Sequence, residues 1–382
     1  MQGETTGPLK GVTVIEMAGI GPVPVAGLML SEMGADVIRI ERIASGTALI
    51  ATAPEYDLDR HGRSVLRLDL KSEEGLATLK RMVAKADVLA EGFRPGVMER
   101  LGLGPDVAQA LNPGLIYARM TGFGQEGPLA AQAGHDLTYL AYTGLLHAIG
   151  PKGGKPIPPL NLAADFGGGT MFLLSGILAA LFERSRSGKG QLVDVAMVDG
   201  ASMLGVVFFG FIGTGFWKEE RGTNLLDSGA PFYDTYETAD GRYVAVACLE
   251  PQFFAEFCSL LPLDDRFAKA QYDKSLWPEM KAAIERRLRE KTRDEWAALF
   301  EPTDACVAPV LTLAEAPHHP HAKARQAHVE VGPLVRPAPA PRLSRTGATP
   351  SEPAAGGKGV LERLGFSGEE VANLVTRGVV GE

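Results

Sequence analysis

The feature that most constrains the fold is a strand–helix–strand pattern at the beginning of the chain. Residues 11–17 are rich in β-branched side chains, residues 22–33 show helical periodicity that ends at Gly34, and residues 36–40 are again β-rich. Strands joined through a crossover helix run parallel, whereas a short hairpin would join antiparallel strands. This stretch therefore predicts a βαβ unit with two parallel strands.

The same alternation continues further along the chain. Strand patterns occur at residues 64–70, 87–93, 114–124 and 192–197, and a helical pattern at 73–86 joins the first two of them. Strands that alternate with helices are typical of a doubly wound sheet. We therefore predict an α/β fold whose large domain contains a doubly wound, mostly parallel sheet.

The pattern changes near residue 225, which predicts a second domain. Residues 229–248 form two aromatic-rich strand patterns around an Ala-Asp-Gly turn, as in a β-hairpin. An exposed amphipathic helix is predicted at 278–291, and a capping box at 292–295 opens the next helix. We predict a smaller α+β domain with its linkers at 226–334, and a large domain made of 1–225 together with 335–382.

The composition disfavours some classes of function. The chain has 382 residues, a net charge of −8 and three cysteines that form no CxxC pair. A nucleic-acid-binding protein usually has a basic balance of charge, so nucleic acid is not an expected partner. The unpaired cysteines and the lack of a recognisable secretory signal predict a reducing, cytoplasmic location.

Two stretches without charged residues, 166–182 and 200–217, barely reach the length of a membrane span. Glycines interrupt both stretches, and ordinary polar segments surround them. We interpret both as buried or interface helices without membrane insertion. Such apolar helices also suggest an oligomer.

The first glycine turn is similar to a dinucleotide-binding loop but incomplete. Gly19 and Gly21 are present, whereas Pro24 stands where the third glycine of the fingerprint belongs. Glu41 follows about twenty residues later, at the distance of a ribose ligand. A tight turn between strand and helix and a phosphate-bearing ligand both explain this pattern.

Basic side chains gather near the ends of the predicted strands. Ligands of open α/β sheets bind outside the carboxyl ends of the strands, and arginine suits phosphate groups. Each residue alone is more often a solvated surface charge, but the grouping favours an anionic ligand. The candidates are Arg39, Arg42, Arg60, Arg63, Lys71, Arg94 and Arg100.

Asp165 and His135 are the candidate acid–base residues. Asp165 directly precedes an expected helix, as an N-cap would, and Gly167 and Gly168 would let a ligand approach the backbone. Backbone N–H groups at the start of that helix could hold an oxyanion. His135 stands beside a turn glycine, where a histidine is more often structural. Glu250 is either a solvated carboxylate or a partner for an imidazole.

A metal site is not expected. The histidine cluster at residues 317–321, Pro-His-His-Pro-His, contains two prolines that deny it the helical spacing of metal ligands. No cysteine lies close to it in the sequence.

Several segments occur in an order that resembles a known family. They include GVTVIEMAGIGPVPVAGLMLSEMGADVIRIER, DVLAEGFRPGVMERLGLGP, LIYARMTGFGQEGPLAAQAGHDLTY and PPLNLAADFGGGTMFLLSGILAALFERSRSGKGQLVDVAMVDG, and together they run nearly continuously from residue 8 to about 254. The chain resembles the α-methylacyl-CoA racemases, in the superfamily that also holds the family III CoA-transferases. The tail, LGFSGEEVANLVTRGVV, looks more like that of a transferase.

The resemblance implies racemisation of 2-methylacyl-CoA thioesters at C2 through an enolate, with His135 and Asp165 as the two bases. It implies supporting roles for Asp136 and for Glu250, which would orient His135, and Gly167 and Gly168 belong to the same predicted site. No cofactor is implied beyond the CoA of the acyl-CoA substrate. An interlocked homodimer is also implied, in which the small domain of one chain covers the large domain of the other. The residues expected to contact CoA are Arg42, Lys71, Phe93, Arg94 and Arg100.

Three other functions stay open at this point. Transferase members of the superfamily use an aspartate matching Asp165 as a nucleophile, and they generally lack a histidine matching His135. An NADP-linked dehydrogenase would use the first glycine turn, which Pro24 disfavours. A non-catalytic acyl-CoA-binding protein would bind CoA esters without proton exchange at C2.

Overall fold

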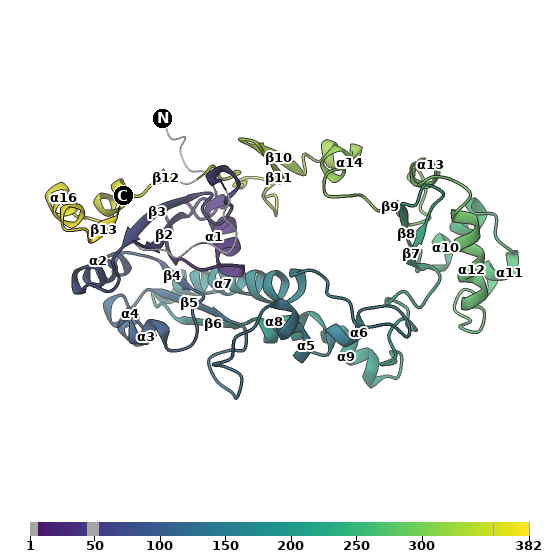
Figure 1. Ribbon diagram of the computed structural model, residues 1–382, viewed down its shortest axis with the longest axis horizontal. Coiled ribbons are helices and arrows are strands. Elements are labelled where there is room, and N and C mark those ends of the chain that lie inside the picture. Colours follow the sequence, from purple (N-terminus) through teal and green to yellow (C-terminus); the bar gives the residue numbers. More distant parts are fainter. Residues whose placement is uncertain (1–6, 44–52, 354, 382) are drawn as a thin grey trace. The chain divides into compact units, whose positions relative to one another are not determined.

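The computed structural model describes residues 7–43, 53–353 and 355–381 (Figure 1). These residues divide into two compact units. The larger unit takes its described residues from Met1–Thr143, Leu160–Leu204 and His321–Glu382, and the smaller unit consists of Gly144–Pro159 and Gly205–Pro320.

An eight-stranded sheet forms the larger unit. Its strand order is β12-β3-β2-β1-β4-β5-β6, and β13 pairs with β3. The β13–β3 pair is antiparallel and all other pairs are parallel, which confirms the predicted mostly parallel sheet. The strands are β1 (Thr13–Met17), β2 (Asp36–Arg42), β3 (Arg63–Leu68), β4 (Val88–Glu91), β5 (Ile116–Thr121), β6 (Leu192–Ala196), β12 (Ala355–Gly356) and β13 (Val380–Gly381).

The chain reverses its direction of travel across the sheet between β1 and β4. It runs outward from β1 through β2 to β3, then returns to β4 on the other side of β1 and continues through β5 to β6. Such a reversal leaves a crevice at the carboxyl ends of the two central strands, where open α/β sheets bind their ligands. The fold therefore points to this edge as the place for a site.

Helices pack on both faces of the sheet because alternate side chains of each strand point to opposite faces. Ile15 and Met17 of β1 join the apolar cluster that contains α2, α4, α15 and α16. Glu16 between them faces α1, where an added Cβ at Gly27 would lie 1.9 Å from its carboxylate. The helices described in this unit are η1 (Pro54–Tyr56), α1 (Pro22–Glu32), α2 (Glu73–Val83), α3 (Val97–Arg100), α4 (Pro105–Leu111), α5 (Asp136–Tyr142), η2 (Leu162–Thr170), α7 (Met171–Ser187), α8 (Met197–Leu204), α15 (Lys358–Arg363) and α16 (Gly368–Thr376).

The smaller unit contains a three-stranded antiparallel sheet in the order β7-β8-β9. The predicted hairpin is confirmed, because Tyr233 pairs with Ala247 and Glu237 with Tyr243. The predicted capping box is also present, with Thr292 and Glu295 each bonding the other's backbone N–H. The elements are β7 (Tyr233–Glu237), β8 (Tyr243–Ala247), β9 (Val307–Pro309), α6 (Leu145–Ala148), α9 (Val206–Gly213), α10 (Pro251–Leu260), α11 (Asp265–Lys269), α12 (Trp277–Leu288), α13 (Arg293–Phe300) and η3 (Ala316–His318).

The remaining elements follow the smaller unit in the chain. The short helix α14 (Pro320–Ala324) begins at the boundary between the units. A two-stranded antiparallel sheet comes next, made of β10 (His328–Val331) and β11 (Leu334–Pro337).

The boundaries of the units differ from the predicted ones. Residues 144–159 and 205–225 belong to the smaller unit, whereas residues 321–334 belong to the larger one. Arg221 accounts for the first difference, because its guanidinium donates to the carbonyl oxygens of His147 at 2.8 Å and Gly154 at 3.0 Å. These bonds attach residues 144–159 to a segment that follows 67 to 74 residues later.

The two charge-free stretches form different structures. The first lies in the helix Leu162–Ser187, which is long and apolar enough to cross a membrane by length and composition alone. This helix packs on the sheet, because an added Cβ at Gly176 would lie 2.6 Å from Val193 of β6. The second stretch breaks at Gly205 into α8 and α9, and no residue of α9 is buried within this chain.

Candidate active site

Asp165 lies in the first turn of a helix that begins at Leu162, and it is not the N-cap residue. The segment η2 is a π-helix, and it continues directly into α7. The prediction that Asp165 is an N-cap is therefore wrong. A π-helical turn carries an extra residue and re-aims its side chains, and such turns are frequent at functional sites.

Asp136 explains how the start of this helix is held. Its Oδ2 accepts hydrogen bonds from the backbone N–H groups of Ala164 at 2.7 Å and Asp165 at 2.8 Å. Asp136 is only 4% exposed, so these charge-assisted bonds are made away from water. These two N–H groups are therefore not available to an oxyanion, and a role for other N–H groups at the start of the helix stays a prediction.

His135 is the N-cap residue of α5, directly before Asp136. Its backbone is held by Thr138, whose Oγ1 accepts from the His135 N–H at 2.9 Å and donates to the His135 carbonyl at 2.7 Å. The side chain of His135 is exposed. The imidazole can therefore contact a ligand, while the hydrogen bonds with Thr138 fix the backbone that carries it.

The structure brings His135 and Asp165 into electrostatic range of one another. Burial raises the pKa of the Asp165 carboxyl, and the charge of Asp136 raises it further. A hydrogen bond from Asn161 at 3.5 Å and the nearby His135 act in the opposite direction. The net effect raises the pKa, so Asp165 can carry a proton closer to neutral pH than an ordinary aspartate.

Tyr139 is a residue of this site that sequence reasoning missed. Its hydroxyl donates to the carbonyl of Gly134 at 2.5 Å, which braces the residue before His135. Burial raises the pKa of Tyr139, the charge of Asp165 raises it further, and the charge of Arg94 lowers it. Tyr139 therefore lies in electrostatic range of both Asp165 and Arg94. Its position four residues after His135, on the same face of a helix, was the available signal.

Four predicted CoA-binding cations lie near the carboxyl edge of the sheet. Arg42 ends β2, Lys71 follows β3, Arg94 follows β4 and Arg100 ends α3. All four side chains are exposed, and none forms an ion pair with a carboxylate in the described part of the chain. Phe93 is half-buried and packs against the apolar core. The contacts of these five residues with CoA stay a prediction.

The other three candidate arginines form ion pairs within the chain. Arg39 and Arg63 are buried, and both form ion pairs with Glu16 of β1, Arg63 at 3.1 Å. Arg60 is committed to Glu41 through two bonds of 2.9 and 2.8 Å. The prediction of phosphate binding is wrong for Arg39 and Arg63, because a buried guanidinium needs a buried partner and cannot reach a ligand.

The glycines after Asp165 allow two helices to touch. An added Cβ at Gly168 would lie 2.4 Å from the backbone nitrogen of Ala201 in α8. An added Cβ at Gly167 would lie 2.8 Å from the side chain of Leu204. Close packing of α8 against η2 therefore explains both glycines, and their part in ligand binding stays a prediction.

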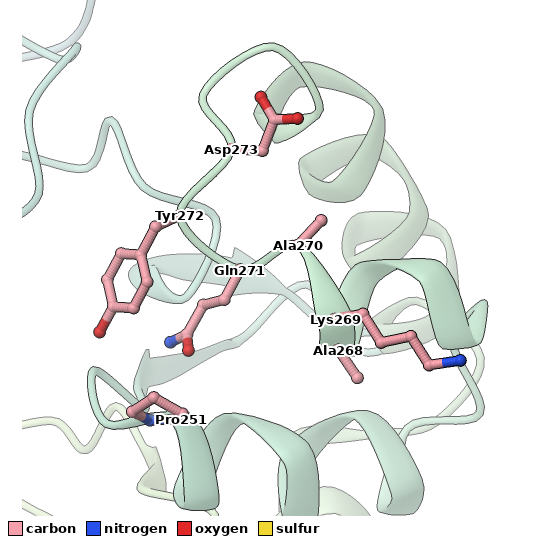
Figure 2. Close-up of a pocket in the computed structure, with 7 residues that line it drawn as sticks. All are labelled: Pro251, Ala268, Lys269, Ala270, Gln271, Tyr272 and Asp273. Atoms are coloured by element: carbon pink, nitrogen blue, oxygen red, sulfur yellow. The ribbon is translucent and has the colours of Figure 1, made fainter.

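Glu250 lies in the smaller unit, exposed at the N-terminus of α10, and its role beside His135 stays a prediction. The chain before it is held by Gln271, whose Nε2 donates to the carbonyls of Cys248 at 3.1 Å and Leu249 at 2.8 Å. Figure 2 shows this glutamine in the lining of a hollow that also includes Pro251, the residue after Glu250.

Among the residues that the structure describes, no group of three or more histidine, cysteine, aspartate or glutamate side chains is arranged to hold a metal ion. The histidine cluster at 317–321 therefore contains no such group.

The doubly wound sheet carries His135 and Asp165 within electrostatic range of one another and exposed cations at the ends of its elements, an arrangement typical of α/β enzymes. The chain belongs to CoA-transferase family III, whose family model matches residues 9–357.

Comparison with named proteins makes the relationship more specific. The chain is 47% identical over 373 residues to the α-methylacyl-CoA racemase of Mus musculus, with 96% of each chain covered. It is 44% identical over 374 residues to the racemase of Homo sapiens, again with 96% of each covered. The crystal structure of a CaiB/BaiF family protein from Brucella suis matches with a TM-score of 0.80 and 26% identity, covering 94% of this chain and 100% of that one. These findings confirm the resemblance seen in the sequence.

Proposed function

We propose that this protein racemises 2-methylacyl-CoA thioesters at C2 by proton transfer to and from His135 and Asp165. The observation that carries the proposal is the link through Asp136. This residue adjoins His135 in the chain and bonds the backbone of Asp165. Asp136 therefore keeps the exposed imidazole of His135 near the carboxyl of Asp165, whose pKa is raised. The names of the mouse and human relatives support the substrate class.

The chemistry follows from the acidity of the hydrogen at C2 of a thioester. That hydrogen is weakly acidic, so its removal needs a positioned base and produces an enolate. Neutral His135 takes the proton of one enantiomer, and protonated Asp165 delivers a proton to the opposite face. For the other enantiomer, the Asp165 carboxylate takes the proton and imidazolium delivers one. Each turnover leaves the pair in the state that the other enantiomer requires.

The raised pKa of Asp165 favours this reaction over CoA transfer. A nucleophilic aspartate must be ionised when it attacks a thioester, whereas one partner of a two-base pair must hold a proton. Burial and the charge of Asp136 both favour the protonated form of Asp165. His135 would also have no evident task in a transferase that works through Asp165.

Arg42, Lys71, Arg94 and Arg100 would bind the phosphate groups of the CoA moiety, and Phe93 would contact its nucleotide. Their position near the carboxyl edge of the sheet supports this part of the proposal. We further propose that Glu250 orients His135 and that Gly167 and Gly168 belong to the site. The proton transfer proposed here needs no cofactor beyond the CoA of the substrate.

We also propose that the protein is a cytoplasmic homodimer that neither inserts into membranes nor binds nucleic acid. The helix α9 supports the dimer, because it presents Val206, Val207, Phe209 and Ile212 to the surface of the single chain. The free Cys248, Cys258 and Cys306 are compatible with a reducing compartment.

Proton exchange at C2 tests the proposed reaction. Each enantiomer of a 2-methylacyl-CoA is incubated with the protein in D2O, and NMR follows deuterium uptake and inversion of configuration. We expect both enantiomers to exchange and invert. The H135A and D165A variants should each lose inversion by at least about 100-fold, because one face then has no proton donor or acceptor.

A carboxylic acid added as an acceptor separates racemisation from CoA transfer. Transfer of CoA to that acid, without exchange at C2 and with full activity in H135A, would make Asp165 a nucleophile and overturn the proposal. Binding of the CoA ester with neither reaction would indicate a non-catalytic binding protein.

A further inference from the structure

Glu91 is a buried carboxylate that the proposed reaction does not use. It ends β4, a central strand of the sheet, and is only 5% exposed. Its Oε2 accepts a hydrogen bond of 2.7 Å from the backbone N–H of Phe93, two residues later. Burial of a carboxylate costs free energy unless its oxygens accept hydrogen bonds. The hydrogen bond from Phe93 offsets part of this cost for Glu91.

The residues after Glu91 are fixed on several sides. Gly92 lies against α1, where an added Cβ would come within 2.9 Å of the Val23 side chain. The ring of Phe93 packs against the apolar core. The carbonyl of Arg94 accepts a hydrogen bond of 3.1 Å from Val97 N–H, where α3 begins. These contacts fix the backbone before and after Arg94.

Arg94 itself is free to meet a ligand. Its side chain is exposed, and it has no ion pair within the described residues. Its charge acts on Tyr139, which also lies in electrostatic range of Asp165. The loop that Glu91 holds therefore presents an unpaired guanidinium close to the proposed acid–base pair.

We propose that Glu91 is a positioning residue for substrate binding. By accepting the Phe93 N–H, it holds Arg94 where its guanidinium binds a phosphate group of the acyl-CoA substrate. Only the identity of the ligand rests on the proposed function. The positioning itself rests on the hydrogen bond to Phe93 and on the packing of Gly92 and Phe93.

The surroundings of Glu91 indicate which substitution preserves its role. The groups near it are Glu99 of α3, Arg119 and Tyr117 of β5, and Asp194 of β6. Burial raises the pKa of Glu91 to about 7, against the effect of the Phe93 N–H. The neutral form of the Glu91 carboxyl is therefore more accessible near neutral pH than that of an ordinary glutamate. Glutamine, which is neutral and has the same shape, can still accept the N–H through its side-chain oxygen.

Binding of CoA to the full-length protein tests this inference independently of catalysis. Isothermal titration of CoA into wild-type, E91A and E91Q protein gives Kd, and C2 exchange of a 2-methylacyl-CoA gives kcat and KM. We expect E91A to weaken CoA binding about tenfold and to raise KM by a similar factor with kcat changed less than about twofold. E91Q should stay within about threefold of wild type.

Glu99 offers a matched control. Its side chain is 47% exposed and lies 3.5 Å from Arg119, but it makes no bond to the loop that holds Arg94. E99Q should leave the Kd for CoA within about twofold of wild type. An E91A variant with wild-type affinity for CoA, or an E91Q variant as weak as E91A, would overturn the inference.

A second variant, G92A, tests the inference if E91A fails to fold. Its added methyl group meets the Val23 side chain of α1 and should displace the same loop. We expect G92A to weaken CoA binding and the double variant V23A/G92A to recover part of the loss. Equal affinity of G92A and wild type for CoA would contradict the inference. Absence of C2 exchange in wild-type protein would instead overturn the proposed function. The comparison of Kd values for CoA between wild-type and variant proteins would still test the role of Glu91.

Discussion

Asp136 contributes to both the position and the acidity of Asp165. Its carboxylate bonds the backbone of Asp165 at 2.8 Å, and its negative charge adds to the effect of burial on the Asp165 pKa. A change at Asp136 can therefore separate these two contributions. Asparagine keeps an oxygen that accepts the backbone N–H groups but carries no charge.

We expect D136N to move the acidic limb of the kcat/KM profile to lower pH. The two-base reaction uses the singly protonated pair, so the acidic limb reports the binding of a second proton. Loss of the Asp136 charge makes Asp165 a stronger acid, and that second proton then binds only at lower pH. The profile is measured as C2 exchange from about pH 4 to 10. An acidic limb that stays in place, or moves to higher pH, would show that Asp136 does not set the acidity of the pair.

The hydroxyl of Tyr139 makes a second residue-scale prediction possible. Y139F removes the hydrogen bond to the Gly134 carbonyl next to His135, so we expect kcat to fall about three- to tenfold. Y142F is the matched control, because Tyr142 is 64% exposed and its hydroxyl has no partner among the described residues. Equal activity of both variants in the exchange assay would show that the bond is dispensable.

The sequence contained the chemical identity of the site but not its pairings. His135 and Asp165 could be proposed from local pattern and resemblance, because His135 follows a glycine and Asp165 stands two residues before a run of glycines, both in motifs of a known family. The pairing of Arg39 and Arg63 with Glu16 could not, because it depends on which face of three neighbouring strands each side chain occupies. In the sequence, arginines that form ion pairs and arginines that do not both stand near the end of a predicted strand. The sequence pattern therefore did not distinguish them.

At the scale of elements, η2 is the least predictable part of the site. A run of apolar residues and glycines after Asp165 favours a helix, and a helix is present, but it begins at Leu162 with π geometry. The start of η2 also depends on a tertiary contact, since Asp136 supplies an acceptor for backbone N–H groups there. No property of residues 162–170 alone specifies that partner.

The packing of η2 on α8 gives an element-scale prediction. G168A introduces a Cβ that would lie 2.4 Å from the Ala201 nitrogen and 2.8 Å from the Met197 carbonyl oxygen. Both are backbone atoms of α8, so the helices must separate. We expect a loss of about 1–3 kcal/mol in the free energy of unfolding, measured in urea, and a lower rate of exchange.

The control for G168A is another helical glycine in open space. An added Cβ at Gly359 of α15 would meet only the end of Arg363, at 3.9 Å. G359A should change stability by no more than about 0.5 kcal/mol. Equal stability of G168A and G359A would show that α8 does not require glycine at position 168.

At the scale of the whole molecule, segments distant in sequence build each unit. The smaller unit takes residues 144–159 from between two parts of the larger one, and Arg221 joins them to its main body. Local patterns predicted the hairpin and the sheet, whereas the boundaries depended on this distant contact. The break at Gly205 has a similar origin, since an added Cβ there would lie 2.5 Å from Leu145.

The exposed face of α9 leads to a prediction about assembly. Phe209 is 56% exposed in the single chain, beside Val206 and Val207, which are each more than half exposed. An apolar face of this kind is unfavourable in water, and in a homodimer a second copy would cover it. We therefore expect light scattering to give twice the mass of one 40.5 kDa chain for the wild-type protein.

F209D should convert the dimer to single chains, because a carboxylate buried in an apolar interface has no partner. V107D on α4 is the control, since Val107 is 41% exposed on a helix whose other residues are mostly polar or small, and it should remain dimeric. Thermal unfolding should show that F209D chains stay folded, because Phe209 makes no buried contact within its own chain. A wild-type protein that is monomeric at all concentrations, or an F209D variant that remains a dimer, would show that α9 does not form the interface.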